Sequence, residues 1–208
     1  RDTAMAFFRD RSPITELRKL RDSNDPDGFS RSLWKMIAEL GWTGFLVSEG
    51  HGGTGFGVIG LAQVMEAAGR TLVASPLMST GLLGASLIDS AGSTDQKDEH
   101  LPAIVGGERL FALALEEGSR HAPARIATTA ARVGAGFVLN GQKIFVLDGH
   151  IADVLIVVAR TSGGRDHRDG ITLFLVPADA AGITRTRLTM LDSRNAARIT
   201  FDNVQVGA

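Results

Sequence analysis

The sequence contains no cysteine. The chain can therefore form no disulfide, thiol nucleophile or thiolate metal site, and the chemistry that depends on them is excluded. A chain without disulfides is compatible with a cytoplasmic location. Long hydrophobic runs are also missing, since the apolar run from Val154 to Ala159 is far shorter than the ~20 residues that a membrane-spanning helix needs. We expect no membrane span.

An excess of charge of one sign is absent as well. The chain has 22 Lys and Arg against 23 Asp and Glu, a formal net charge of -1. A balanced chain has no long-range field to attract nucleic acid or an acidic membrane, so we expect neither as a partner. The densest basic stretch, Arg9 to Arg21, is interleaved with acids and indicates a solvated helix face. The N-terminus lacks a signal-peptide layout, and a start at Arg1 without Met indicates a trimmed or longer protein.

The first half of the sequence has the pattern of helices. Apolar residues recur every three or four positions from Phe29 to Leu40. Gly41 follows at the position where a helix C-terminus favours glycine. Three further helices are predicted, from Val58 to Gly69, from Pro76 to Ile88 and from Thr94 to Gly106.

After Gly107 the pattern changes to short strands. Within the stretch from Gly136 to Val146, the pair Asn140-Gly141 separates two apolar segments. This pair favours positive φ at both central positions, which is typical of a type I′ hairpin. Eight short strands with polar turns argue for a closed or sandwiched β domain. They are predicted at residues 110–115, 126–133, 137–139, 143–147, 154–159, 171–176, 183–188 and 197–206.

The predicted fold class is therefore α+β, with an N-terminal helical bundle followed by an antiparallel β-barrel or sandwich domain. The boundary is expected at Gly106-Gly107, which gives domains at residues 1–107 and 108–208. A chain of 208 residues is long enough for two modest domains, each with its own core.

The segment from Glu49 to Gly55 is rich in glycine. Such a segment can direct backbone amides at a phosphate when it opens a helix. This one lacks the Gly-Lys-Ser/Thr ending of a nucleotide-binding loop, and no clear βαβ unit surrounds it. We expect a tight turn between helices.

Side chains for other chemistry are scattered. The five histidines have no partner at metal-ligand spacing, so no metal site is expected. The absence of a Gly-x-Ser-x-Gly elbow argues against a serine hydrolase. The pair Glu116-Glu117 is compatible with a two-carboxylate catalytic site, which would need a raised pKa. Paired surface acids in a turn are the commoner arrangement and the one we expect.

The order and spacing of several segments, from about Trp34 to Val206, resemble the acyl-CoA dehydrogenase family. No single segment is decisive, but their succession is specific. They are Leu40-Gly41-Trp42, Glu49 through Gly55, Ala112-Leu113-Ala114-Leu115-Glu116, Leu139-Asn140-Gly141-Gln142-Lys143, Ala152-Asp153 and Phe201-Asp202-Asn203-Val204.

The resemblance implies an FAD-dependent oxidoreductase that desaturates an acyl-CoA thioester between its α and β carbons. A hydride would pass to FAD, and an electron-transfer flavoprotein would accept the electrons. The flat flavin ring would pack against two strands, since such a ring needs apolar walls. A homo- or hetero-oligomer is implied, and Ser119 would lie nearer the phosphate or substrate. The implied flavin wall consists of Ala112, Leu113, Ala114, Leu115, Phe145, Val146 and Leu147.

The sequence departs from the family pattern at three places. Leu115 stands where the family usually has Thr. The segment Phe145-Val146-Leu147 replaces Trp-x-Thr. Together with Leu115, Leu147 therefore removes two hydroxyls that would face the flavin. The segment Glu117-Gly118-Ser119-Arg120 replaces Pro-x-x-Gly-Ser-Asp, and Arg120 reverses the charge beside Ser119.

The resemblance also implies a domain that this chain lacks. Family members continue beyond the position of Ala208 into a helical domain that carries the catalytic carboxylate. The chain is therefore expected to contain no catalytic base and not to catalyse dehydrogenation alone. Two alternatives stay open: a non-catalytic partner subunit of a hetero-oligomeric acyl-CoA dehydrogenase, and a flavin-dependent oxidase or monooxygenase on the same scaffold.

Overall fold

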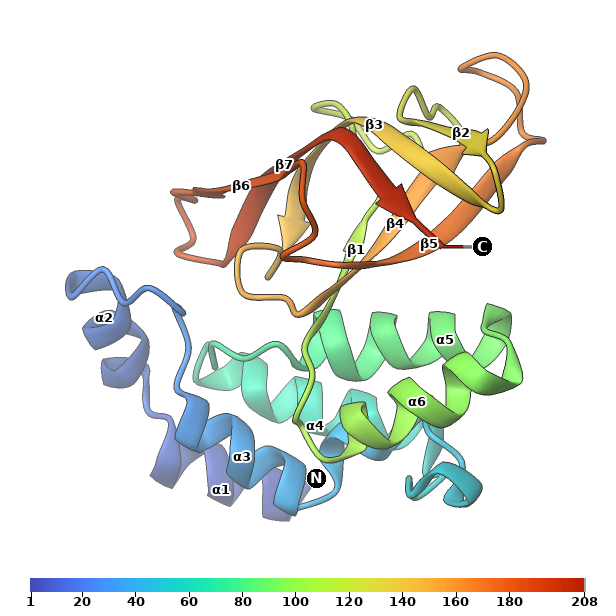
Figure 1. The fold of residues 1–208 in the computed structure, drawn as a ribbon. Helices are drawn as coiled ribbons and strands as arrows, with labels where there is room; N and C mark the ends of the chain where they lie inside the picture. Colours follow the sequence, from blue (N-terminus) through green and yellow to red (C-terminus); the bar gives the residue numbers. More distant parts are fainter. Residues whose placement is uncertain (208) are drawn as a thin grey trace. The chain divides into compact units, whose positions relative to one another are not determined.

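The computed structural model describes residues 1–207 and divides into two compact units (Figure 1). The first, Arg1–Leu110, is helical, and the second begins at Phe111 and consists of strands. The α+β class, with its helical half first, is confirmed. The division lies three residues beyond the Gly107 at which the first domain was predicted to end.

The helical unit contains three helices close to their predicted positions. The sequence pattern from Phe29 to Leu40 forms α3, and those from Val58 and from Thr94 form α4 and α6. The third predicted helix, from Pro76, is a π-helix (η3) that continues into α5. None of the helices within residues 1–207 is long and apolar enough to cross a membrane. The elements are α1 (Asp2–Arg11), α2 (Ile14–Asp22), α3 (Arg31–Glu39), η1 (Trp42–Gly44), η2 (Glu49–His51), α4 (Gly57–Arg70), η3 (Leu77–Gly84), α5 (Ala85–Ala91) and α6 (Thr94–Val105).

Side-chain caps and burial explain where these helices form. Ser93 and Gln96 form a reciprocal capping box at the start of α6, which satisfies two amides that the helix leaves without partners. The stretch from Arg9 to Arg21 spans the end of α1 and most of α2. Because α2 has no buried residue, the predicted solvated helix face is confirmed there.

The glycine-rich segment is a tight turn, as predicted. The Gly53 amide donates to the Ser48 carbonyl at 3.0 Å, and the Gly55 amide donates to the Val47 carbonyl at 2.9 Å. These amides are bonded to the chain itself and are not free to converge on an anion. The phosphate-loop alternative therefore finds no support here.

The second unit contains one mixed sheet of seven strands within the described residues (Figure 1). β4 pairs antiparallel with β5 and parallel with both β1 and β2, while β3 pairs antiparallel with β2 and β7. β6 completes the sheet beside β7. The strands are β1 (Phe111–Ala114), β2 (Thr129–Val133), β3 (Gly136–Leu147), β4 (Val154–Arg160), β5 (Ile171–Pro177), β6 (Ile183–Leu188) and β7 (Ala196–Val206).

The predicted hairpin at Asn140-Gly141 is wrong. β3 runs through both residues without a turn. The hairpin between β2 and β3 turns instead at Gly134-Ala135, where Gly134 has φ +59°. Seven strands therefore replace the predicted eight, because the two short strands on either side of Asn140-Gly141 are one.

Tertiary pairing overrides the local turn preference of Asn140. Its Oδ1 accepts a hydrogen bond from the Asn203 amide of β7 at 2.9 Å, and its Nδ2 donates to Asn203 Oδ1 at 3.3 Å. Two residues of β7, Asp202 and Asn203, face the single Asn140 at a β-bulge, and Asn203 has φ +54°. The Asn side chain thus bridges strands where a turn was expected.

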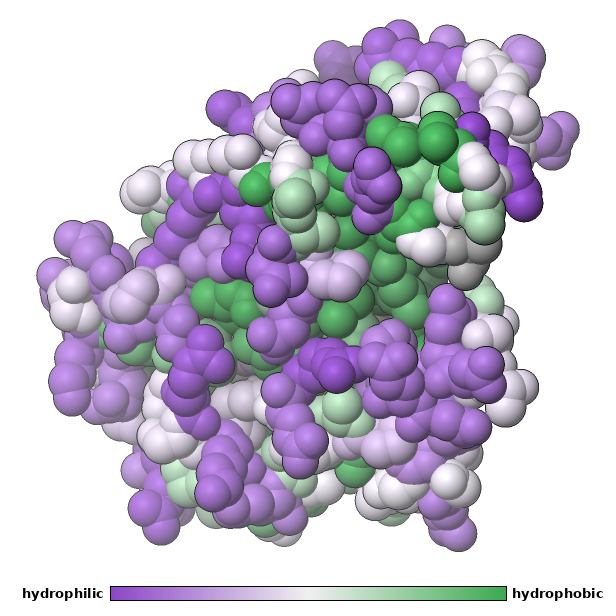
Figure 2. Space-filling model, in the orientation of Figure 1, coloured by the Kyte–Doolittle hydropathy of each residue, from purple (hydrophilic) through white to green (hydrophobic). Residues whose placement is uncertain are grey.

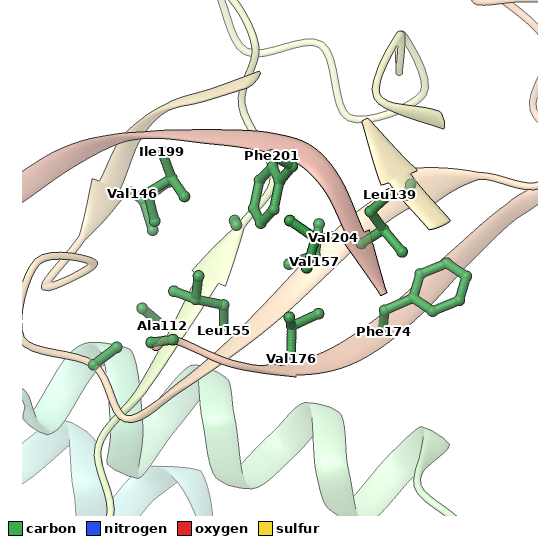
Figure 3. Close-up of a cluster of buried hydrophobic side chains, with 14 of the residues drawn as sticks. Ala112, Leu139, Val146, Leu155, Val157, Phe174, Val176, Ile199, Phe201 and Val204 are labelled. Atoms are coloured by element: carbon green, nitrogen blue, oxygen red, sulfur yellow. The ribbon is translucent and has the colours of Figure 1, made fainter. Parts of the chain in front are cut away.

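The core of the β unit lies on one face of the sheet (Figure 3). β4 is buried at every position, as is typical of a strand in the middle of a sheet. Side chains from five other strands, or from the turns beside them, join β4 in the core cluster. The cluster contains Ala112, Ala114, Ala130, Leu139, Val146, Ala152, Leu155, Val157, Ala159, Phe174, Val176, Ala178, Ala197, Ile199, Phe201 and Val204.

Candidate functional site

The chain that leaves β1 lies directly beside β3. The Ile144 amide donates to the Glu116 carbonyl at 2.8 Å. The Lys143 ammonium donates to the Leu115 carbonyl at 3.1 Å. These contacts bring together the two segments that the family resemblance implies as a flavin wall.

A β-bulge sets the direction of the side chains at the end of β3. Ile144 and Phe145 together face the single Arg198 of β7, and Phe145 adopts φ +54°. Beyond the bulge, Val146 is buried in the core, whereas Phe145 is 42% exposed and Leu147 38% exposed. The bulge therefore places two large apolar side chains on an open surface.

The first predicted wall segment is divided by strand alternation. Ala112 and Ala114 belong to the core cluster, as Val146 does on β3. Leu113 and Leu115 alternate with them and are half-buried. The side chains of Leu113 and Leu115 are therefore the ones that a bound ring can reach. Those of Ala112 and Ala114 pack into the core instead.

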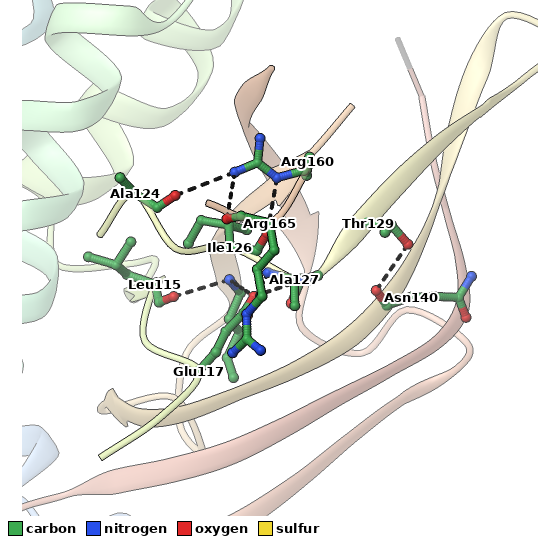
Figure 4. A network of polar contacts seen from close by, with 11 residues as sticks. Leu115, Glu117, Ala124, Ile126, Ala127, Thr129, Asn140, Arg160 and Arg165 are labelled. Atoms are coloured by element: carbon green, nitrogen blue, oxygen red, sulfur yellow. Dashed lines mark hydrogen bonds and ion pairs between the residues drawn. The ribbon is translucent and has the colours of Figure 1, made fainter. Parts of the chain in front are cut away.

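Ser119, which the resemblance implies near the phosphate or substrate, lies outside the strands. It occupies an exposed bend, between Gly118 and Arg120. The segment that follows is held at its base by two buried charged side chains, Glu117 and Arg160 (Figure 4).

Lys143 and Glu117 form a buried ion pair next to the two predicted wall segments. Lys143 Nζ lies 2.8 Å from Glu117 Oε1, and the two side chains are 0% and 8% exposed. The carboxylate also accepts the amides of Ala127, at 2.7 Å, and Thr128, at 2.8 Å. The expectation of paired surface acids is thus wrong for Glu117.

Burial and pairing oppose each other in this ion pair. Burial raises the pKa of Glu117, but the hydrogen bonds from Lys143, Thr128 and Ala127 outweigh it and hold that pKa below its usual range. For Lys143, burial dominates and lowers the pKa, although Glu117 opposes the shift. We assign the charged forms to both, because each has a partner of opposite charge within hydrogen-bond distance.

Sequence reasoning missed this pair, although a signal was present. Lys143 stands an even number of residues after Leu139 in the same strand, which places both on one face of a regular strand. Leu139 is a core residue, so the alternation pointed Lys143 inward as well. A buried lysine requires a nearby acceptor, which Glu117 provides although we had expected it at the surface.

Arg160, at the end of β4, is the second buried charge of this region. Its guanidinium donates only to backbone carbonyls among the hydrogen bonds of the described residues, and Figure 4 shows part of this arrangement. The guanidinium thereby fixes the residues before β2 and the loop between β4 and β5. The acceptors are the carbonyls of Ala124, Ile126, Ser162, Arg165, His167 and Asp169.

Titratable side chains elsewhere form pairs. His51 Nε2 lies 3.1 Å from Asp98 Oδ1, and its Nδ1 lies 3.0 Å from Ser48 Oγ. His121 Nδ1 lies 2.5 Å from Glu116 Oε1. In the part of the chain that the structure describes, no group of three or more His, Asp or Glu side chains could hold a metal ion.

The exposed wall fits the apolar part of a flavin. Phe145 and Leu147 offer aromatic and aliphatic surface, and Leu115 lies on the adjacent segment. Apolar side chains are also visible on the β unit in Figure 2. These three side chains carry no hydroxyl, so hydrogen bonds to the polar edge of a ring would have to come from the backbone.

Family models cover nearly the whole chain. The model of the acyl-CoA dehydrogenase N-terminal domain matches residues 1–108, and that of the acyl-CoA dehydrogenase middle domain matches residues 112–204. The acyl-CoA dehydrogenase FadE12 of Mycobacterium tuberculosis is 31% identical over 85% of this chain and 46% of its own length. The benzylmalonyl-CoA dehydrogenase of Aromatoleum aromaticum is 32% identical over 75% of this chain and 41% of its own. The chain thus spans less than half the length of these relatives.

Solved structures give the same result. A variant of the Tcur3481-Tcur3483 steroid ACAD aligns with a TM-score of 0.86 and 32% identity, covering 97% of this chain and 53% of that one. The ChsE4-ChsE5 complex from Mycobacterium tuberculosis aligns with a TM-score of 0.87 and 26% identity, covering 100% of this chain and 54% of that one.

Proposed function

Because the chain belongs to the acyl-CoA dehydrogenase family, we propose that it forms the flavin-binding half of an enzyme that desaturates an acyl-CoA thioester. The whole enzyme would pass electrons to an electron-transfer flavoprotein. We include a cytoplasmic location in this proposal. The relatives' names span aromatic and steroid substrates, so we propose no narrower acyl group.

One observation carries the proposal beyond the family. The two predicted wall segments lie side by side, joined by the bond from the Ile144 amide to the Glu116 carbonyl. They present Phe145 and Leu147 on an open surface. Large apolar side chains exposed together mark a place where another apolar surface binds.

This geometry suggests a role for each residue of the wall. Bound FAD would supply the hydride acceptor for the substrate's β-carbon. Phe145 and Leu147 would hold the plane of the ring and exclude water from it. Leu115 would close the adjacent side. The α-proton would be removed by a carboxylate outside this chain, where the family resemblance places the catalytic base.

The replacement Phe145→Asp in the full-length protein tests the wall. We expect the purified variant to lose most of its FAD, because a carboxylate in place of the ring removes a stacking surface and adds a charge that must be desolvated. The measurement is the ratio of flavin to protein in the visible and ultraviolet spectrum.

Val133→Asp is the matched control, since Val133 is another exposed apolar side chain of the same unit, at 60% exposure. It should retain flavin. If Phe145→Asp retained as much flavin as Val133→Asp, the assignment of this strand would be wrong.

Two leucines favour a second function, that of a non-catalytic partner subunit. Leu115 and Leu147 stand where the family usually has threonines, and both structural relatives named above are complexes of two different chains. These observations support a partner subunit that stabilises a catalytic homologue. Flavin retained only after co-purification with a second family member would favour this alternative, whereas flavin in the protein purified alone would exclude it.

A further inference from the structure

We propose that Lys143 is a positioning residue that sets the spacing between the two wall segments. The proposal rests on the proposed flavin function, because it concerns the surface to which FAD would bind. The Lys143 side chain is fully buried and is therefore not part of that surface. It would act through Leu115 and Phe145.

Lys143 has contacts that suit this role. Its side chain is 0% exposed, and its ammonium donates to the Leu115 carbonyl at 3.1 Å and to Glu117 at 2.8 Å. Phe145 follows two residues later, at the bulge. Lys143 thus belongs to the same strand as Phe145, and its ammonium is hydrogen-bonded to the other wall segment at Leu115.

Glu117 extends this connection to a third segment. Its two carboxylate oxygens accept the amides of Ala127 and Thr128, which precede β2. The ion pair therefore links the chain beyond β1, the entry to β2 and the middle of β3. A displacement of Lys143 would loosen the connection between all three.

Stability alone does not account for such a pair. Two buried charges lose their hydration, and exchanging a buried ion pair for uncharged groups of similar volume is often neutral or even stabilising. The ammonium of Lys143 does more than balance a charge. It needs a hydrogen-bond acceptor at a fixed distance, and the Leu115 carbonyl is such an acceptor. The pair is therefore expected to affect the geometry of the wall more than the stability of the fold.

The test uses the double variant Glu117→Gln/Lys143→Met in the full-length protein. It removes both charges, retains their approximate volumes and leaves no unpaired buried charge. The single variant Lys143→Met is measured beside it. Lys35→Met is the matched control, because it makes the same change in a lysine whose side chain is 79% exposed.

The first readout is residue-resolved hydrogen exchange in the flavin-free protein. We expect the Ile144 amide, which bonds to Glu116, to exchange about tenfold faster in the double variant, as the loss of one charge-assisted hydrogen bond implies. Amides between β4 and β5 should exchange as in the wild type. Unchanged exchange at Ile144 would overturn the proposal, and so would a uniform increase throughout the β unit.

The second readout is the FAD dissociation constant together with the visible spectrum of the bound flavin. We expect about tenfold weaker binding and an altered band shape in the double variant, with no change in Lys35→Met. Wild-type affinity and spectrum in the double variant would refute the positioning role. Failure of the wild-type protein to bind FAD would refute the proposed function instead, while the exchange at Ile144 would still decide whether Lys143 sets the spacing.

Discussion

At the scale of single residues, two buried charges organise the region around the candidate wall. Lys143 pairs with the carboxylate of Glu117, whereas Arg160 donates to backbone carbonyls. Glu117 accepts amides on one side of the segment before β2, and Arg160 bonds to carbonyls of the same segment. The carboxylate thus pairs with backbone amides and the guanidinium with backbone carbonyls. Together they fix a segment that has no regular secondary structure.

The pH dependence of stability should reveal the role of Glu117. Its pKa is held below the ordinary value in the folded protein, so as the pH falls the unfolded chain takes up the proton first. The stabilisation is complete above the ordinary carboxylate pKa of about 4.3 and is lost as the pH falls through the lower folded value. In urea unfolding between pH 6 and pH 3, the stability difference between wild type and Glu117→Gln should shrink as the pH falls. A constant difference would show that Glu117 does not titrate with unfolding.

The residue scale also shows where sequence reasoning ended. Phe145 could be singled out through a motif, since the family resemblance predicts it in the proposed wall. Its exposure could not be predicted, because that depends on a bulge which forms only when β3 pairs with β7. Glu117 was misjudged because its partner Lys143 lies 26 positions later. The alternation in β3 points Lys143 inward but does not identify the acid that pairs with it.

At the scale of elements, β3 is the strand whose path differs most from the sequence-based expectation. It pairs with β2 from Gly136 to Asn140 and with β7 along most of its length, with two register shifts, at Asn140 and at the Ile144-Phe145 bulge. The strands on either side of Asn140-Gly141 could be predicted from their apolar residues. That the two form one continuous strand could not be predicted, because the side chain of Asn140 bonds to Asn203 of β7 and the chain does not turn there.

Replacing Gly141 by alanine tests the observed path of β3. Gly141 has φ +149°, and a Cβ there would come within 2.7 Å of the Thr128 Cα. Gly141→Ala should therefore lower the free energy of unfolding by about 2–4 kcal/mol, through overpacking added to backbone strain.

Gly134→Ala provides the comparison for this change. Gly134 also has a positive φ, but a Cβ added there would meet no described atom within 4 Å, so only strain of about 1 kcal/mol is expected. Urea unfolding of both variants gives the answer. Equal costs would mean that Gly141 lies in an open turn, as the hairpin prediction had it.

At the scale of the whole molecule, the chain consists of two units that match two successive family domains. Their order could be predicted because the change from helical to strand periodicity is visible near Gly107. The mixed pairing of the sheet could not, because the parallel partners β1 and β4 lie about forty residues apart and no local signal links them. The relatives named above extend well beyond the part of their length that this chain matches.

The most direct test is the visible spectrum of the full-length protein, purified alone, before and after anaerobic addition of acyl-CoA substrates. We predict bound flavin, with oxidised absorbance that bleaches when a suitable acyl-CoA is added, because hydride transfer reduces the ring. A protein without flavin, or with flavin that a broad panel of acyl-CoA thioesters leaves oxidised, would contradict the proposed dehydrogenase function.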